Sequence, residues 1–144
     1  MNQNVIEIHS DSEYQQLYAL CLQNNNILVC DYSASWCRPC QQIAPFYQQL
    51  ADLSKTDEET SNLFVFAKID VDECPTTAAH YKVKAMPTFM VLYGGQQLQS
   101  MKGANKDGLR AMVEQAHLDW RAAQKTVAVQ PQENNQEGQM IETA

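Results

Sequence analysis

A chain of 144 residues is long enough for a single domain with a hydrophobic core of ordinary size. Its composition, 44% hydrophobic and 19% charged residues, is typical of a folded globular protein and excludes a disordered or fibrous one. The formal net charge of -7 excludes a basic footprint for nucleic acid, and no apolar run approaches the roughly 18 to 20 residues of a membrane span.

The first half of the chain alternates strand and helix patterns. Apolar and polar side chains alternate over residues 4–10, which predicts a short strand, and apolar residues at helical spacing from Tyr14 to Cys21 then predict a helix. Residues 27–33 form a continuous apolar run, typical of a central strand covered on both faces. A second helix is predicted around the apolar positions from Ile43 to Leu53, and the polar, acidic residues 54–62 predict a loop.

The second half continues with a strand pattern over residues 63–72 and a short helix over 75–84, which begins with a proline. Two strand-like runs within residues 86–104 flank a pair of glycines and predict a hairpin. An amphipathic helix is predicted over 106–123. This order predicts an α/β fold with a central mixed β-sheet, three parallel strands plus a C-terminal antiparallel hairpin, flanked by four helices.

The composition changes after the last predicted helix. Residues 124–144 contain no aromatic residue and are rich in Gln and Glu, which predicts a disordered polar tail or a partner-binding segment. The predicted domain therefore covers residues 1–123. The N-terminus lacks a basic stretch followed by an apolar one, and the cysteines number five, which is odd. We therefore expect no secretory signal and a reducing, cytoplasmic location.

Two cysteines, Cys37 and Cys40, lie where the central strand gives way to a helix. A zinc site needs four ligands, and the other cysteines and the histidines are scattered, so no metal is expected. A structural disulfide here would close a very small loop and constrain the unfolded chain little. A thiol at a helix N-terminus faces unpaired N–H groups and the positive end of the helix dipole, which favour the reactive thiolate. The pair therefore predicts a redox site with an exposed, easily ionised Cys37.

Several further motifs accompany this pair at compatible spacing. They are WCRPC at 36–40 after ILVCDYSAS at 27–35, AP at 44–45, AKIDVD at 67–72, AMPTF at 85–89 and GA at 103–104. With them, the chain resembles the thioredoxin family over about residues 5–122, in its animal-type cytosolic form with a CRPC variant of the active-site motif. The resemblance implies a thioredoxin fold and a protein-disulfide reductase that works through its own dithiol and supports cell redox homeostasis.

The resemblance also implies partners. It implies no bound metal or organic cofactor, electrons from NADPH through a thioredoxin reductase, and disulfide-containing proteins as targets, and we expect a monomer. Nucleic acid and membranes are not expected as partners of so acidic a chain. A second hypothesis is a redox-regulatory binding subunit of the same fold with little turnover. The long tail and Arg38 favour that subunit, whereas the complete set of site residues favours the enzyme.

Within the family pattern, Cys37 is the attacking nucleophile and Cys40 is the resolving thiol. Asp31 lies near the end of the apolar strand, where burial would raise the pKa of its carboxyl and let it exchange protons with Cys40. The resemblance implies this role, and it implies Lys68 as the partner of Asp31. From the residues alone, Asp31 could instead cap the strand, Lys68 could be a solvated lysine and Cys40 a small buried residue.

The resemblance implies a target-binding surface of Trp36, Arg38, Pro39, Met86 and Pro87. The bond before Pro87 is cis in the family, and Met86 would present backbone groups to an extended target peptide. Trp36 would form an apolar rim, with a core tryptophan as the alternative. Arg38 stands where the family motif has glycine. A cation beside the nucleophile favours its thiolate, so Arg38 should raise the reduction potential and alter target preference.

Three cysteines remain outside the motif. Cys21 and Cys30 fall on apolar faces and are predicted to lie in the core. The resemblance implies that Cys74 lies near the docking surface, which makes it a candidate regulatory thiol, open to glutathionylation or to a disulfide that links two chains. An idle surface thiol is the alternative interpretation of Cys74.

Overall fold

A computed structural model describes residues 4–129 of the chain, with side chains as far as residue 125. In chain order, the strands and helices are β1 (Val5–Ile8), α1 (Asp11–Asn24), β2 (Ile27–Ser33), α2 (Arg38–Ser54), α3 (Glu58–Ser61), β3 (Phe64–Asp70), α4 (Pro75–His80), β4 (Thr88–Tyr93), β5 (Gln96–Lys102) and α5 (Lys106–Val129). The chain divides into two compact units, residues 1–113 and 114–144, and the first of them holds the sheet and helices α1 to α4.

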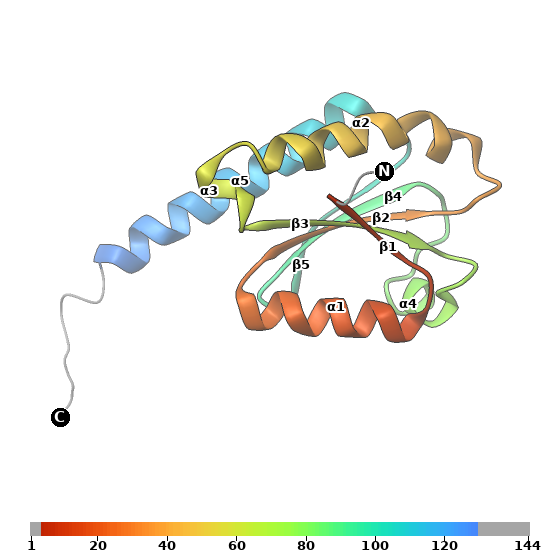
Figure 1. The fold of residues 1–144 in the computed structure, drawn as a ribbon, viewed down its shortest axis with the longest axis horizontal. Coiled ribbons are helices and arrows are strands. Elements are labelled where there is room, and N and C mark those ends of the chain that lie inside the picture. The colour runs from red at the N-terminus through yellow and green to blue at the C-terminus, as the bar shows by residue number, and fades with distance from the viewer. Residues whose placement is uncertain (1–3, 130–144) are drawn as a thin grey trace. The chain divides into compact units, whose positions relative to one another are not determined.

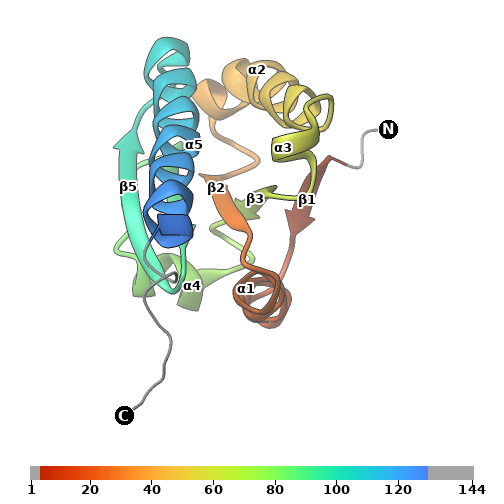
Figure 2. The ribbon, with the colours of Figure 1, turned by 90° about the vertical axis from the view of Figure 1, so that its left-hand side faces the viewer.

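The strands form one mixed sheet in the order β1-β3-β2-β4-β5 (Figure 1). β1 and β2 pair parallel with β3, while β4 runs antiparallel to β2 and β5 antiparallel to β4. Helices α1 and α4 cover one face of the sheet and α2 covers the other, as the side view in Figure 2 also shows. The predicted α/β fold, with three parallel strands and a C-terminal hairpin, is confirmed.

The middle strand, β2, is the best-buried element, because all of its residues are buried, as the apolar run predicted. Its side chains alternate between the two faces of the sheet. On the α2 face, the hydroxyl of Tyr47 lies within hydrogen-bond distance of the backbone carbonyls of Val29 (3.1 Å) and Ala67 (2.6 Å). On the other face, Cys30 packs in a cluster with Tyr14 of α1. Burial of each large side chain here stabilises the fold by roughly 1.5–3 kcal/mol.

Helix α4 is shorter than the helix predicted over residues 75–84. It ends at His80 because Lys82 takes a left-handed backbone conformation, with φ at 58°. The amide of Val83 then donates to the carbonyl of Ala78 (2.9 Å), which closes the helix end. Sequence periodicity did not reveal this stop, since the left-handed position is not occupied by glycine.

Two further differences concern α3 and α5. The predicted loop over 54–62 holds the short helix α3, because Asp57 accepts a hydrogen bond from the amide of Glu59 (3.0 Å) and caps it. α3 therefore adds a helix to the four that the sequence predicted. Helix α5 continues to Val129, past its predicted end at residue 123. Residues 130–144 lie outside the described residues, so the disordered tail and the domain limit stay predictions.

The turn between β4 and β5 follows from its glycine pair. Gly94 and Gly95 both have positive φ, at 61° and 82°. Two successive residues of positive φ suit a tight turn between twisted antiparallel strands, and glycine takes this conformation without a steric penalty. The hairpin that the sequence predicted around this pair is confirmed.

Candidate active site

Cys37 and Cys40 lie where the chain leaves β2 and enters α2. They are joined by a disulfide, with their Cα atoms 5.3 Å apart. Cys37 is the N-cap residue of α2, and its Sγ accepts a hydrogen bond from the backbone N–H of Cys40 (3.2 Å). Pro39 stands in the first turn, where a missing N–H costs no helix hydrogen bond. The sequence therefore placed the pair correctly at a helix N-terminus.

The predicted exposure of Cys37 is wrong for this disulfide form. Cys37 is 5% exposed and Cys40 is 1% exposed. Both pack with Ala34 and Met86, and the Sγ atom of Cys37 lies 3.6 Å from the carbonyl oxygen of Met86. The sequence motif alone did not predict this burial, because Met86 belongs to a loop far away in the sequence.

The loop that faces the disulfide contains a cis peptide bond between Met86 and Pro87, as the family resemblance implied. The carbonyl of Pro87 accepts a hydrogen bond from the amide of Gly103 (2.8 Å), and the Thr88 hydroxyl donates to the carbonyl of Ala85 (2.6 Å). These bonds fix the loop at its position beside Cys37.

Trp36 is a surface residue, with 65% of its side chain exposed. The core alternative is therefore excluded. Its indole N–H donates to Oδ2 of Asp72 in the turn after β3 (2.8 Å). Sequence reasoning missed this partner, although the acidic residues at the end of the AKIDVD motif were a signal for it. Arg38 and Pro39, the two residues between the cysteines, are also exposed.

Asp31 is fully buried, at 0% exposed. Among the residues that the structure describes, no group donates a hydrogen bond to either of its carboxyl oxygens. Burial raises the pKa of the Asp31 carboxyl to about 7, and the positive charge of Lys68 lowers it by a smaller amount. The predicted rise in pKa is confirmed in direction. Lys68 is the register partner of Asp31 on β3 and is half-buried.

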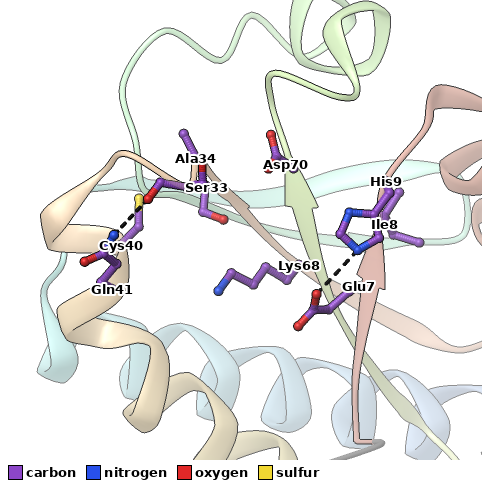
Figure 3. Close-up of a pocket in the computed structure, with 10 residues that line it drawn as sticks. Glu7, Ile8, His9, Ser33, Ala34, Cys40, Gln41, Lys68 and Asp70 are labelled. Carbon is purple, nitrogen blue, oxygen red and sulfur yellow. Dashed lines mark hydrogen bonds and ion pairs between the residues drawn. The ribbon is translucent and has the colours of Figure 1, made fainter.

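A cavity of about 260 Å³ reaches Cys40 from the β1 side (Figure 3). Its lining includes Lys68, and also three titratable residues that sequence reasoning did not single out: Glu7, His9 and Asp70. His9 lies against two carboxylates, with Nδ1 at 2.6 Å from Glu73 and Nε2 at 3.4 Å from Glu7. The strand patterns gave no signal for this group, because its members meet only through the pairing of β1 with β3.

The prediction of a surface thiol at Cys74 is wrong. Cys74 is 0% exposed, and its Sγ lies 3.7 Å from the carbonyl oxygen of Ile8. Burial raises the pKa of the Cys74 thiol to about 11. A thiol in this position is not placed for glutathionylation or for a disulfide between chains. Cys21 and Cys30 are buried, which confirms their predicted place in the core.

The described residues hold neither a metal site nor a membrane-spanning helix. Within residues 4–129, His, Cys, Asp and Glu do not gather in any group of three or more that could hold a metal ion. In the same part of the chain, every helix is too short or too polar to cross a membrane.

Comparison with known proteins identifies close relatives of this arrangement. The profile of the thioredoxin family matches residues 5–115. Horse thioredoxin is 40% identical over 109 residues, which cover 76% of this chain and 95% of the horse protein. Human thioredoxin is 38% identical over 109 residues, which cover 76% of this chain and 95% of the human protein.

Solved structures agree with the sequence relatives. A poplar thioredoxin h superposes with a TM-score of 0.71 at 35% identity, over 81% of this chain and 98% of the poplar chain. The thioredoxin pre-protein of Schistosoma mansoni superposes with a TM-score of 0.65 at 32% identity, over 78% of this chain and 98% of the Schistosoma chain.

A close dithiol at a helix N-terminus, beside a cis-proline loop on this fold, defines a thiol–disulfide oxidoreductase. The chain belongs to the thioredoxin family. Its activity is therefore protein-disulfide oxidoreduction, and the alternative of a binding subunit with little turnover is not favoured.

Proposed function

We propose that the chain is a protein-disulfide reductase in which Cys37 is the nucleophile and Cys40 the resolving thiol. The Cys37 thiolate attacks a target disulfide, forms a mixed disulfide and releases one target thiolate. Cys40 then loses its proton and attacks the Sγ of Cys37, which releases the second target thiolate and leaves the Cys37–Cys40 disulfide. The observation that carries the proposal is this disulfide at the start of α2.

The backbone around Cys37 supports its role as the nucleophile. Its sulfur lies at the N-terminus of a helix of 17 residues, within hydrogen-bond distance of the Cys40 amide. Both the amide and the helix dipole stabilise a negative charge on sulfur. This position therefore favours the thiolate of reduced Cys37 over its thiol.

Asp31 is proposed as the group that takes the proton from Cys40. A carboxyl with a pKa of about 7 can accept and release a proton near neutral pH. In this proposal Lys68, on the neighbouring strand, limits the rise in the pKa of Asp31 by its positive charge. The cavity beside Cys40 and Lys68 gives protons a route to solvent.

Target proteins are proposed to dock on Trp36, Arg38, Pro39, Met86 and Pro87. An extended target segment would pair with the backbone of the Met86–Pro87 loop, in the manner of strand addition. Trp36 supplies exposed aromatic surface beside the dithiol, and Arg38 adds a positive charge that favours acidic target segments.

The proposed partners follow from the family. We propose that a thioredoxin reductase, supplied with NADPH, returns the Cys37–Cys40 disulfide to the dithiol, and that disulfide-containing proteins are the targets. The proposed setting is the cytoplasm, where the protein acts as a monomer in cell redox homeostasis and electron transport. The buried position of Cys74 supports the monomer, because it removes the intermolecular disulfide considered from the sequence.

Reduction of insulin by dithiothreitol, and by NADPH with a thioredoxin reductase, tests the proposal. We expect Cys37→Ser to abolish turnover in both assays. Cys40→Ser should instead accumulate a mixed disulfide with the target, visible on a non-reducing gel. Cys74→Ala serves as the control, because it removes a buried thiol outside the site and should keep turnover. Turnover in Cys37→Ser equal to that of wild type would overturn the assigned roles.

A further inference from the structure

Three charged side chains form a row across three neighbouring strands. Glu7 on β1 is the register partner of Lys68 on β3, and Lys68 is also the register partner of Asp31 on β2. Register partners in parallel strands project from the same face of a sheet, so the three side chains lie side by side beneath α2. Exposure decreases along the row, from exposed Glu7 through half-buried Lys68 to fully buried Asp31.

The cavity joins the outer part of this row to the resolving cysteine. Glu7, Lys68 and Cys40 all line the same space of about 260 Å³. Figure 3 shows the Lys68 side chain running from β3 toward α2, with its nitrogen on the side away from Glu7. The cavity leaves the ammonium group room to swing back toward Glu7 at the outer end of the row.

Two carboxyl groups, those of Glu7 and Asp31, stand on the strands at either side of Lys68. Among the described residues that line the cavity, Lys68 is the only lysine or arginine. In the described part of the chain, no ion pair joins Lys68 to Glu7 or to Asp31. The Glu7 carboxylate instead lies 3.4 Å from Nε2 of His9. A negative charge at Glu7 attracts the ammonium outward and opposes a second negative charge at Asp31.

We propose that Glu7 is a positioning residue that acts on Asp31 through Lys68. By drawing the ammonium toward the outer end of the row, Glu7 keeps the buried carboxyl protonated to higher pH. It thereby sets the pH range in which Cys40 can give up its proton to Asp31. The inference rests on the proposed role of Asp31 as the proton acceptor. His9 moderates the effect, because its protonated ring pairs with Glu7 and neutralises part of its charge.

Other titratable groups lie around this row. Asp70 on β3 and Cys40 and Tyr47 on α2 lie on the same face, Cys30 lies on the opposite face of β2, and Glu13 and Glu73 lie beside His9. Burial keeps the Cys30 thiol and the Tyr47 hydroxyl neutral by raising the pKa of each. The Asp70 carboxylate accepts the amide of Asp72 (2.8 Å), which fixes it in the turn after β3. Glu7 is the acid beside Lys68 in the strand register, and His9 is the ring that contacts it.

Titration of the Asp31 carboxyl by carbon-13 NMR in the oxidised protein tests the proposal directly. We expect Glu7→Gln to lower the titration midpoint of Asp31 by about half a pH unit, because a partly screened charge is removed. Glu58→Gln, an exposed acid on α3, is the matched control and should leave the midpoint unchanged. In a Lys68→Met background the shift should fall to less than half. An unchanged or raised midpoint in Glu7→Gln would overturn the proposal.

The pH profile of the resolving step separates this proposal from the role of Asp31. In single-turnover release of a mixed disulfide, Glu7→Gln should move the inflection to lower pH by the same amount as the titration. Asp31→Asn should remove the inflection. If Asp31→Asn leaves the profile intact, Asp31 is not the proton acceptor. If Asp31→Asn removes the inflection and Glu7→Gln leaves it in place, Asp31 keeps its role and the role of Glu7 is overturned.

Discussion

The indole N–H of Trp36 donates a hydrogen bond of 2.8 Å to Oδ2 of Asp72. This bond joins the loop before α2 to the turn after β3. Because Trp36 is 65% exposed, packing alone does not fix its ring. The hydrogen bond therefore holds an exposed aromatic surface in one orientation before any target arrives, which lowers the entropic cost of docking.

Asp72→Ala should weaken target docking while the fold stays intact. We expect KM for insulin to rise about 2- to 5-fold with kcat little changed, because an exposed, singly bonded side chain loses its fixed orientation. The free energy of unfolding should change by less than about 1 kcal/mol in urea denaturation. Asp107→Ala, which removes an exposed carboxylate near Arg110, is the control. A KM equal to that of wild type would show that the bond plays no part in docking.

Arg38→Gly should make the protein a stronger reductant. Arg38 directly follows Cys37 in the chain, and a positive charge there favours the thiolate and hence the reduced form, so its removal should lower the reduction potential by about 10 mV. The side chain is exposed, which keeps the effect small. Equilibration with a glutathione redox couple measures it. Arg38→Lys keeps the charge and should keep the potential. Equal potentials in wild type and Arg38→Gly, or a lower one in wild type, would refute the prediction.

Asp31 should make the protein less stable as pH rises. Its pKa is about 7 in the folded chain against an ordinary value of 3.8. Between about pH 4 and pH 7, the folded state therefore keeps a proton that the unfolded state has lost, so stability falls as pH rises. The penalty is absent below this window and complete above it.

Asp31→Asn removes this pH dependence, because an amide does not titrate. Relative to wild type, the free energy of unfolding of the oxidised variant should increase by about 2 to 3 kcal/mol between pH 5 and pH 8. Comparing two pH values cancels the constant cost of burying an amide. Urea denaturation at both pH values is the measurement. A difference between the two proteins that does not change with pH would show that Asp31 is not a buried carboxyl with a raised pKa.

The fold was predictable because most of its determinants are local. Each predicted element was indicated by a short stretch of chain. The signals were the apolar run of β2, the helical spacing of apolar residues in α1 and α2, and the glycine pair of the hairpin. Glycine favours turns with positive φ, and proline favours the first turn of a helix, so both residue types also indicate structure locally. The short α3 and the early stop of α4 were missed, because a single aspartate cap and a left-handed lysine give weak signals.

The site was predictable only in part, because much of it depends on strand register. The dithiol is one contiguous motif, and Asp31 lies in the strand that precedes it. Glu7 meets Lys68 only after β1 pairs with β3. Trp36 meets Asp72 across 36 positions of sequence. Contacts between residues so far apart in the chain leave no periodic pattern in the sequence, so sequence patterns do not predict them.

Cys74 is the clearest case of a position that sequence reasoning misplaced. The family resemblance implied a thiol near the docking surface at this position. In the fold, however, Pro75 begins α4 directly after it, and the thiol turns inward beneath the end of β1. Its burial depends on Ile8, 66 positions earlier in the chain.

Thiol labelling can check the buried position of Cys74. In native reduced protein, we expect a maleimide reagent to modify Cys37 quickly and Cys74 at least about 100-fold more slowly. Cys74 can react only when the structure opens, and burial that raises its pKa to about 11 leaves little thiolate at neutral pH. Mass spectrometry after timed labelling gives the two rates.

The labelling of Cys74 should follow unfolding. Its rate should rise with urea in parallel with the unfolded fraction, whereas the rate at Cys37 is already high in native protein. Cys74→Ala should remove one label from the urea-unfolded protein and none from the rapidly labelled native protein. Diamide should then produce no disulfide-linked dimer from the native wild type, because no surface of Cys74 is accessible to a second chain. Fast labelling of Cys74 in the native protein would mean that its thiol reaches solvent. A dimer that Cys74→Ala abolishes would mean that the thiol can form a disulfide between chains.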